Sequence, residues 1–221
     1  GGNIMRIEKV IDISRKISED MIVWPGDPNV HITKCCSIDD GSDLNLSNIS
    51  MGLHTGTHID APLHFIKGGV DVSSMEPGSF IRFVKVFSVS AVNCITEKDL
   101  KDLPINEGDA LFFRTSNSDL PENSAFNKNF VYMDLSAAQY LVEKKVEVVG
   151  IDYFSIDGYE VQGHPVHKLF LSNGIIIVEG LYLKDVADGE YLCSFLPLKI
   201  NGADGSPVRA LLMEIKEDKI I

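Results

Sequence analysis

Short segments of alternating and β-branched residues dominate the first half of the chain and predict strands. The polar residues 39–43 separate two of these segments and predict an antiparallel hairpin that leads towards His54. The predicted strands lie at residues 7–13, 29–37, 44–51, 80–90 and 110–115. The pattern therefore indicates a fold with much β structure.

Two segments carry helical signals. Residues 96–99 read Thr-Glu-Lys-Asp, which resembles a capping box at the start of a short helix. Residues 136–145 have the strongest helical pattern, with Asp134 or Ser136 as the N-cap, and the apolar segment 146–151 follows directly. A helix that leads into an apolar strand is typical of a strand covered on both faces. The chain is therefore expected to cover part of its sheet with helices.

Glu179 interrupts an apolar run at residues 174–183 that otherwise has the pattern of a central strand. A buried carboxylate without a partner is costly, so a cation or metal ion is expected to meet it. The alternative is a glutamate at a strand end that reaches solvent beside Gly180. Upstream, the segment 164–167, His-Pro-Val-His, supplies further imidazoles.

The remaining segments are less regular. Residues 196–200 and 208–215, joined by a turn at 202–206, predict a closing hairpin. Residues 116–129 are polar and predict a loop of little information. No internal repeat or low-complexity segment divides the chain.

The only tryptophan, Trp24, begins the turn-rich segment Trp-Pro-Gly-Asp-Pro at residues 24–28. Taken alone, such an indole is expected to fill the edge of a core. The alternative is an aromatic wall for a flat substrate, because an indole offers a large apolar face.

Size and charge restrict the class of protein. The chain has 221 residues and 24.4 kDa, and 44% of its residues are hydrophobic, enough for one domain with a substantial core. We expect this single domain to span residues 5–221. A net charge of −12 disfavours nucleic acids and anionic membranes, which bind basic surfaces. A small molecule is the expected partner.

The cysteines and the first residues bear on the compartment. Cys35 and Cys36 are adjacent, Cys94 and Cys193 are isolated, and no Cys-x-x-Cys spacing occurs. They are expected to be reduced packing residues of a cytoplasmic protein. The N-terminal residues contain no long apolar stretch, so neither a signal peptide nor a membrane span is predicted. Residues 1–4 are expected to remain from the removal of a tag.

Candidate chemistry is concentrated in residues 54–64, His-Thr-Gly-Thr-His-Ile-Asp-Ala-Pro-Leu-His, which hold three of the six histidines. In an extended backbone, side chains alternate between two faces, so four ligand-type side chains of this segment would point the same way. They are His54, His58, Asp60 and His64. His58 and Asp60 would lie roughly 6 to 7 Å apart at ~3.3 Å per residue, which suits two ligands of one ion.

His54 fits this geometry only if the segment bends. A straight strand would hold it roughly 13 Å from His58, and Gly56 between them permits a bend because it lacks a Cβ. Pro62 argues against a helix that runs on to His64. Two histidines four residues apart recur by chance, but four ligand-type residues of one parity favour a metal site. The segment is therefore expected to be a bent loop or strand edge that binds metal, with a catalytic base attached.

Other short motifs are distributed along almost the whole chain. They are Trp24-Pro25-Gly26-Asp27, Gly150-Ile151-Asp152, Ser155-Ile156-Asp157, His167 through Glu179, Leu196-Pro197-Leu198 and Gly205-Ser206-Pro207-Val208-Arg209. Together with the segment 54–64, they resemble the cyclase family of metal-dependent hydrolases, which includes bacterial kynurenine formamidases. The resemblance implies an α/β fold, a single β-rich domain of swivelling β/β/α type, and assembly as a homodimer or higher homo-oligomer.

The resemblance also implies two divalent metal ions. His54, His58 and Asp60 match the ligands of one ion. Asp60, His167 and Glu179 match the ligands of a second ion, so Asp60 would bridge the two. Three imidazoles and two carboxylates without a thiolate suit zinc, our first choice, and would also accept manganese.

His64 matches the general base or acid of the family, and Trp24 matches a residue that contacts an aromatic substrate. The implied reaction is hydrolysis of N-formyl-L-kynurenine to kynurenine and formate, a step of tryptophan catabolism, by a metal-activated water. Residues 158–166 differ from the sequence expected in a kynurenine formamidase. The alternative is therefore a hydrolase of another small acyl substrate: a cyclic amide such as isatin, an imide, a lactone or an ester. A non-catalytic metal-binding homologue is less favoured, because it would not need His64.

Overall fold

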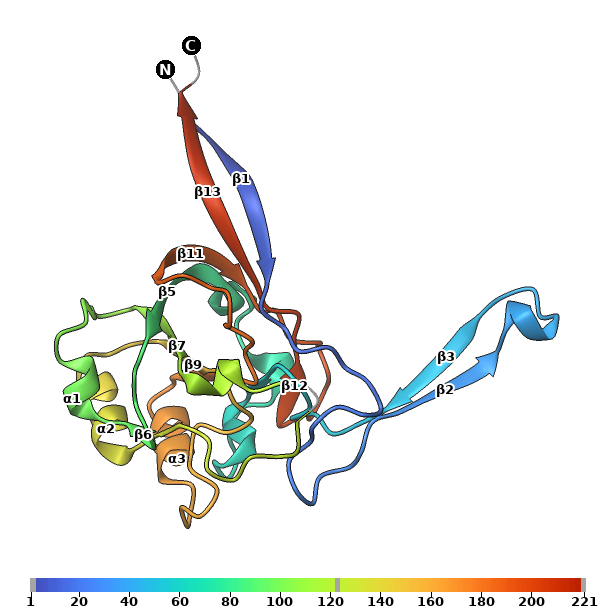
Figure 1. Ribbon diagram of the computed structural model, residues 1–221, viewed down its shortest axis with the longest axis horizontal. Coiled ribbons are helices and arrows are strands. Elements are labelled where there is room, and N and C mark those ends of the chain that lie inside the picture. The colour runs from blue at the N-terminus through green and yellow to red at the C-terminus, as the bar shows by residue number, and fades with distance from the viewer. Residues whose placement is uncertain (1–2, 122–123, 220–221) are drawn as a thin grey trace.

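The computed structural model describes residues 3–121 and 124–219, which fold as one mixed α/β domain (Figure 1). In this part of the chain, nine strands form one sheet in the order β1-β13-β11-β5-β7-β9-β10-β4-β12. Their bounds are β1 (Asn3–Asp12), β4 (His58–Asp60), β5 (Ile81–Ser88), β7 (Ala110–Arg114), β9 (Val148–Ile151), β10 (Ile176–Glu179), β11 (Gly189–Ser194), β12 (Gly205–Pro207) and β13 (Leu211–Lys219). The expectation of an α/β, β-rich domain is confirmed.

The N-terminal strand begins inside the stretch for which a tag remnant is expected. Asn3 and Ile4 pair with β13 as part of β1. Residues 1–2 lie outside the described residues.

The centre of the sheet is parallel and covered on both faces. β5, β7, β9 and β10 pair in parallel, and α1 (Glu97–Leu100), α2 (Leu135–Glu143) and α3 (Pro165–Ser172) pack on one face. Side chains of β7 alternate between the faces: Phe113 packs with the helices, whereas Phe112 belongs to the opposite core. The prediction of a strand covered on both faces is confirmed.

Local signals at two helices and one hairpin are also confirmed. The capping box at residues 96–99 opens α1. Asp134, rather than Ser136, is the N-cap of α2, because its carboxylate accepts a backbone amide of the first turn at 2.9 Å. β2 (His31–Cys36) and β3 (Leu46–Ser50) pair antiparallel as predicted.

The predicted closing hairpin is wrong. Residues 196–200 form no strand of the sheet, β12 lies at the predicted turn and pairs with β4, and β13 pairs with β1 and β11 towards the other end of the sheet. Between the predicted hairpin strands, an isolated bridge joins Pro197 to Val208. Partners that lie far apart in the sequence outcompete the local pairing, because they bury more apolar surface.

The sequence did not predict α3, because the residue before its first turn has an unusual backbone conformation. The helix begins at Pro165, directly after His164, whose φ of +51° is left-handed. Proline at the first helical position replaces an amide that would have no partner within the helix. Its length of eight residues also gives a weak periodic signal.

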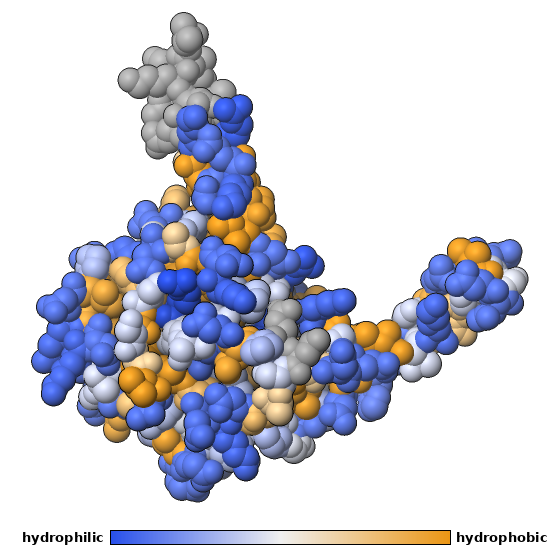
Figure 2. Space-filling model, viewed as in Figure 1, coloured by the Kyte–Doolittle hydropathy of each residue, from blue (hydrophilic) through white to orange (hydrophobic). Residues whose placement is uncertain are grey.

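Two antiparallel ribbons project from the body of the domain, one formed by β1 and β13 and the other by β2 and β3 (Figure 1). Apolar surface is visible on both in Figure 2. The exposed apolar side chains are Met5, Ile7 and Val10 on the first ribbon and Ile32, Leu46 and Ile49 on the second. A two-stranded ribbon is only marginally stable by itself in water.

The other regular elements are short. β6 (Cys94–Ile95) pairs in parallel with β8 (Tyr132–Met133). The 3₁₀ helices are η1 (Ile38–Asp40), η2 (Pro62–His64), η3 (Val72–Ser74), η4 (Pro77–Phe80) and η5 (Ser116–Asp119). None of the helices within residues 3–121 and 124–219 has the length and apolarity needed to cross a membrane.

Candidate metal centre

Residues 54–64 run through a turn, a short strand and a helical turn rather than along one extended strand. The predicted bend is present: Gly56 has a φ of +67° and lets the chain turn between His54 and β4. Pro62 begins the single 3₁₀ turn η2, which ends at His64. The predicted common parity is therefore wrong. Of the two expected settings, a loop or a strand edge, the loop describes residues 54–57, whereas β4 lies between β10 and β12 and is not at an edge.

Strand pairing brings carboxylates and imidazoles to the face of the sheet that α3 covers. β4 and β10 place His58 opposite Glu179 and Asp60 opposite Ile177. Ile177 belongs to the core under the helices, so the side chains of its strand neighbours with the same parity face α3. α3 contributes His167 to this place.

Asp60 lies between two groups of ligand-type atoms. Its Oδ1 is 2.9 Å from His54 Nδ1 and 3.7 Å from His58 Nε2. Its Oδ2 is 3.5 Å from His167 Nε2, which lies 3.0 Å from Glu179 Oε1. Ligand atoms about 2.0 Å from a tetrahedral ion lie roughly 3.3 Å from one another. The structure therefore brings together all five residues that the sequence nominates as metal ligands, with Asp60 between the two groups.

The second ring nitrogen of each of these imidazoles is engaged by an oxygen. His54 Nε2 is 3.0 Å from Asp204 Oδ2, and His167 Nδ1 is 2.6 Å from Asp157 Oδ2. His58 Nδ1 is 3.0 Å from the carbonyl oxygen of Gly56. Imidazoles that bind metals almost always donate their other N–H to such an oxygen. The sequence analysis missed both aspartates, although Asp157 lies in a landmark motif.

Two buried polar atoms test whether a metal ion fits. Among the described residues, His58 Nε2 and Asp60 Oδ2 are buried without a hydrogen bond of good geometry, although His58 Nε2 lies 3.2 Å from Glu179 Oε2. Atoms of His58, Asp60 and Glu179 lie within 4.8 Å of one another. An unpaired polar atom in a core is costly, and nitrogen and carboxylate oxygen are ligands of zinc and similar ions. The donor set therefore fits a divalent cation.

Neighbouring carboxylates raise the pKa values of His54 and His167, the imidazoles on either side of Asp60. Burial opposes protonation, but Asp60 and Asp204 raise the pKa of His54 to about 9. Burial likewise opposes protonation of His167, whereas Glu179 and neighbouring carboxylates raise its pKa to about 10. Positive charge is therefore favoured on both sides of the central carboxylate.

The pKa values of Glu179 and His64 are shifted in the directions that their expected roles, metal ligand and base, require. Burial would raise the pKa of Glu179, but His167 and His58 hold it well below its usual range, so the side chain is a carboxylate. Burial lowers the pKa of His64. The imidazole is therefore neutral at pH 7 and able to accept a proton.

A cavity of about 440 Å³ opens over this centre. His64 and Trp24, which the sequence nominates for catalysis and for substrate contact, both line it. The wall also includes Phe65, Phe154 and His164. A cavity of this size with aromatic walls and a polar floor suits a small aromatic molecule.

Trp24 belongs to a cluster of aromatic rings. Its ring centroid is 5.1 Å from that of Phe126, 5.5 Å from Tyr159 and 6.2 Å from Phe130. Phe126 lies within residues 116–129, which were expected to be an uninformative loop. Apart from η5, the described part of this segment is a loop as expected, and Phe126 gives it a role in the aromatic wall. Its phenylalanine in a polar sequence was the available signal.

The same region secures a buried carboxylate at the end of β9. Asp152 accepts hydrogen bonds from two backbone amides and three side chains at 2.7 to 3.3 Å. The donors belong to Thr115, Asn117 and Ser118. Both oxygens of Asp152 are thus satisfied by the protein itself, in contrast to Asp60 Oδ2.

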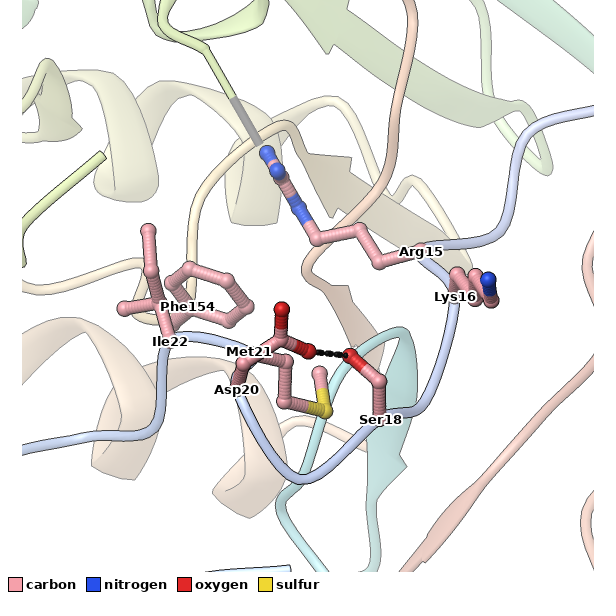
Figure 3. A pocket seen from close by; sticks show the side chains of 7 residues that line it. All are labelled: Arg15, Lys16, Ser18, Asp20, Met21, Ile22 and Phe154. Carbon is pink, nitrogen blue, oxygen red and sulfur yellow. Dashed lines mark hydrogen bonds between the residues drawn. The ribbon is translucent and has the colours of Figure 1, made fainter. Parts of the chain in front are cut away.

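A second cavity, of about 250 Å³, shares Phe154 with the first (Figure 3). Arg15 lines it, but its guanidinium donates to the carbonyl oxygen of Asp152 at 3.1 Å and lies 4.9 Å from the Phe154 ring centroid. Figure 3 also shows the Ser18 hydroxyl bonded to Asp20. Arg15 thus ties the N-terminal segment to Asp152 and Phe154 beside the first cavity, whereas the Ser18–Asp20 bond stays within the segment.

Comparison with known proteins agrees with this class of fold and site. The model of the Cyclase family matches residues 11–158. The chain therefore belongs to this family, as its landmark motifs predict.

The relatives sharpen the family assignment. A kynurenine formamidase of Bacillus cereus is 32% identical over 211 residues, which cover 96% of this chain and all of the relative. A solved structure from Bacillus stearothermophilus, described as a predicted metal-dependent hydrolase, is 38% identical with a TM-score of 0.82 and covers 95% of this chain and 98% of that one. Isatin hydrolase A of Labrenzia aggregata shares the fold at 23% identity and a TM-score of 0.81, covering 95% and 93% of the chains.

Proposed function

We propose that this protein is a metal-dependent hydrolase of small amides and that N-formyl-L-kynurenine is its leading substrate. The observation that carries the proposal is the centre around Asp60, where five ligand-type side chains converge. The ring nitrogen of each imidazole that faces away from the centre contacts an oxygen atom of the protein. Relatives named kynurenine formamidase cover almost the whole chain. The aromatic cavity over the centre suits an aryl substrate.

The centre would hold two divalent ions. His54 Nδ1, His58 Nε2 and Asp60 Oδ1 would hold the first, and Asp60 Oδ2, His167 Nε2 and Glu179 the second. Ligands of this kind suit zinc first and manganese next. When bound, such ions lower the pKa of water towards about 7 and polarise a carbonyl oxygen.

The protein's own residues would then position the substrate and move the proton. The aryl ring would lie against Trp24, with the formyl group over the centre. His64 would accept the proton of the attacking water and return it to the amide nitrogen as the carbon–nitrogen bond breaks. Water supplies the oxygen of formate and the hydrogen of the released amine, so the reaction needs no other co-reactant.

The second candidate is a hydrolase of another small acyl compound, such as a cyclic amide, an imide, a lactone or an ester. Residues 158–166 favour it, because they form part of the cavity surroundings and depart from the sequence expected in a kynurenine formamidase. Tyr159 packs on Trp24, and His164 lines the cavity. These two residues would adjust the shape of the site to the substrate.

The decisive experiment measures formate release from N-formyl-L-kynurenine by the purified protein. The protein is assayed as isolated, after chelation, and after zinc or manganese is added back. We expect turnover that chelation abolishes and metal restores. Metal-loaded protein without formate release would contradict this substrate, and the same assay series would then use isatin, cyclic imides, lactones and aryl esters.

We also infer a homodimer in the cytoplasm. The two projecting ribbons expose apolar side chains, which a second copy of the chain would cover. β2 and β3 pair only with each other in the described part of the chain, so both outer edges of that ribbon can accept a further strand. The four cysteines carry no disulfide, which suits a reducing compartment.

A further inference from the structure

Asp204 occupies a position that neither the ligand set nor the proposed base accounts for. One oxygen of its carboxylate, Oδ2, is 3.0 Å from His54 Nε2 and 3.4 Å from His64 Nδ1. The first imidazole is a proposed metal ligand, and the second is the proposed base. A single oxygen atom therefore faces both functional groups.

The two imidazoles are also in direct contact. Their ring centroids are 3.9 Å apart with an angle of 24° between the planes, so the rings stack. The carboxylate of Asp204 lies at the edge of this stack, on the side of His54 Nε2 and His64 Nδ1. Any rotation of its side chain would change the hydrogen bond with His54 and the 3.4 Å contact with His64.

The backbone holds Asp204 in this place. Its carbonyl oxygen accepts the amide of Ala61 at 2.9 Å, which extends the pairing of β12 with β4. The next residue, Gly205, leaves no room for a side chain, because a Cβ would lie 2.5 Å from His54 Cε1. β12 is thus fitted closely against His54, and Asp204 enters the site at a fixed register.

We propose that Asp204 is a positioning residue that sets the tautomers of His54 and His64, a role that rests on the proposed function of the centre. It would accept the N–H of His54 Nε2, which leaves Nδ1 directed at Asp60 as a metal ligand. It would also accept the N–H of His64 Nδ1, which leaves Nε2 for the proton transfer. Asp204 would thereby orient the metal ligand and the base together.

A surface carboxylate without such a role is the competing explanation, because the Asp204 side chain is 44% exposed. This exposure makes the residue suitable for mutation, since no core packing depends on it. Asp204→Asn removes the charge but keeps the shape, and Asp204→Glu keeps the charge. Asp39→Asn, on the exposed η1, is the matched charge control.

Asp71→Asn is the structural control. The Asp71 carboxylate accepts the amide of Gly202 and so supports the same turn without contact to either imidazole. Circular dichroism and melting curves for all variants establish that each is folded before other measurements are made.

The experiment compares zinc affinity, the visible spectrum of the cobalt-substituted protein, and kcat against KM. For Asp204→Asn we expect zinc to bind about 10- to 100-fold more weakly, the typical effect of losing such a partner. The cobalt bands should shift and kcat should fall, with KM changed less than kcat. Asp204→Glu should recover part of each loss, and both control variants should match the wild type.

Zinc affinity, cobalt spectrum and kcat within twofold of the wild type in folded Asp204→Asn would overturn the proposal. An equal loss in Asp71→Asn would also overturn it, because the effect would then belong to the turn. If the wild type binds metal but releases no formate, the proposed substrate fails while zinc affinity and the cobalt spectrum still decide the role of Asp204. If folded Asp204→Asn is not obtained, the same measurements are made on Asp204→Ala. Zinc binding at least tenfold weaker than in Asp71→Asn then supports the proposal, and zinc affinity and a cobalt spectrum within twofold of the wild type overturn it.

Discussion

The metal centre and the projecting ribbons depart from the usual distribution of polar and apolar groups in opposite directions. The centre buries the side chains of His58, Asp60 and Glu179 within the core, whereas the ribbons expose Ile32 and Ile49 to solvent. Buried charge and exposed apolar surface are both costly. The comparison leads to the same proposal for both regions, namely completion from outside the chain: divalent cations would complete the first, and a second copy would complete the other.

The largest expected effect concerns the base in the centre. His64→Ala should lower kcat by ~10²- to 10⁴-fold, because a general base or acid contributes about that much. Metal content, measured by atomic emission, should stay at the wild-type value, since His64 is not one of the proposed ligands. His31→Ala, on the exposed β2, is the control for loss of an imidazole. Loss of both metal ions in His64→Ala would identify His64 as a ligand.

The next effect concerns the ligands. Glu179→Ala should reduce the metal content by one ion per chain, because Glu179 is expected to bind only the second ion with His167. The measurement is metal stoichiometry after dialysis against a defined zinc concentration. Glu190→Ala, on the exposed part of β11, is the control. Unchanged stoichiometry would remove Glu179 from the centre.

Asp152 is a buried carboxylate outside the metal centre, and its hydrogen bonds all come from the protein, so it serves as a comparison with the carboxylates of the centre. Asp152→Asn keeps the shape of the side chain but turns an acceptor into an amide donor towards Thr115 and Ser118. The free energy of unfolding should fall by about 3 kcal/mol, because buried donors lose a charged partner. Urea unfolding measures this change, and exposed Asp185→Asn should stay within about 0.5 kcal/mol of the wild type. A stability loss that zinc reverses would instead tie Asp152 to the metal.

The smallest expected effect on activity lies in the ribbons. The double variant Ile32→Lys and Ile49→Lys should elute as a chain of 24.4 kDa instead of twice that mass, because a charged pair on the ribbon prevents its burial. Light scattering after gel filtration measures the mass. Val92→Lys, at an exposed apolar residue outside the ribbons, should leave the dimer intact. A monomeric wild type would contradict the dimer altogether.

Much of the local structure could be predicted from the sequence. The capping box of α1, the N-cap region of α2 and the β2–β3 hairpin depend on residues close together in the chain. The five ligand-type residues were also identified before the fold was known. They carry chemistry that is rare in a core, and their motifs resemble a known family.

Long-range pairing accounts for the errors. β12 pairs with β4 rather than with a neighbouring segment, and this register brings Asp204 to His54 and His64. Asp157 reaches His167 because the chain turns into α3 at the left-handed His164. Asp204 has no local signal, since an aspartate in a loop is common in any sequence, and the motif that contains Asp157 does not reveal which imidazole it meets.

The sequence by itself determined the ligand types, the bend at Gly56 and the polarity of Glu179, because these follow from side-chain chemistry and from the freedom of one glycine. The tertiary structure alone decided the face on which those groups meet and the carboxylates that hold their imidazoles. The physical reason is that strand register and helix docking are set by burial of apolar surface summed over the whole domain. A residue such as Asp204 takes its role from the partners that this burial brings to it.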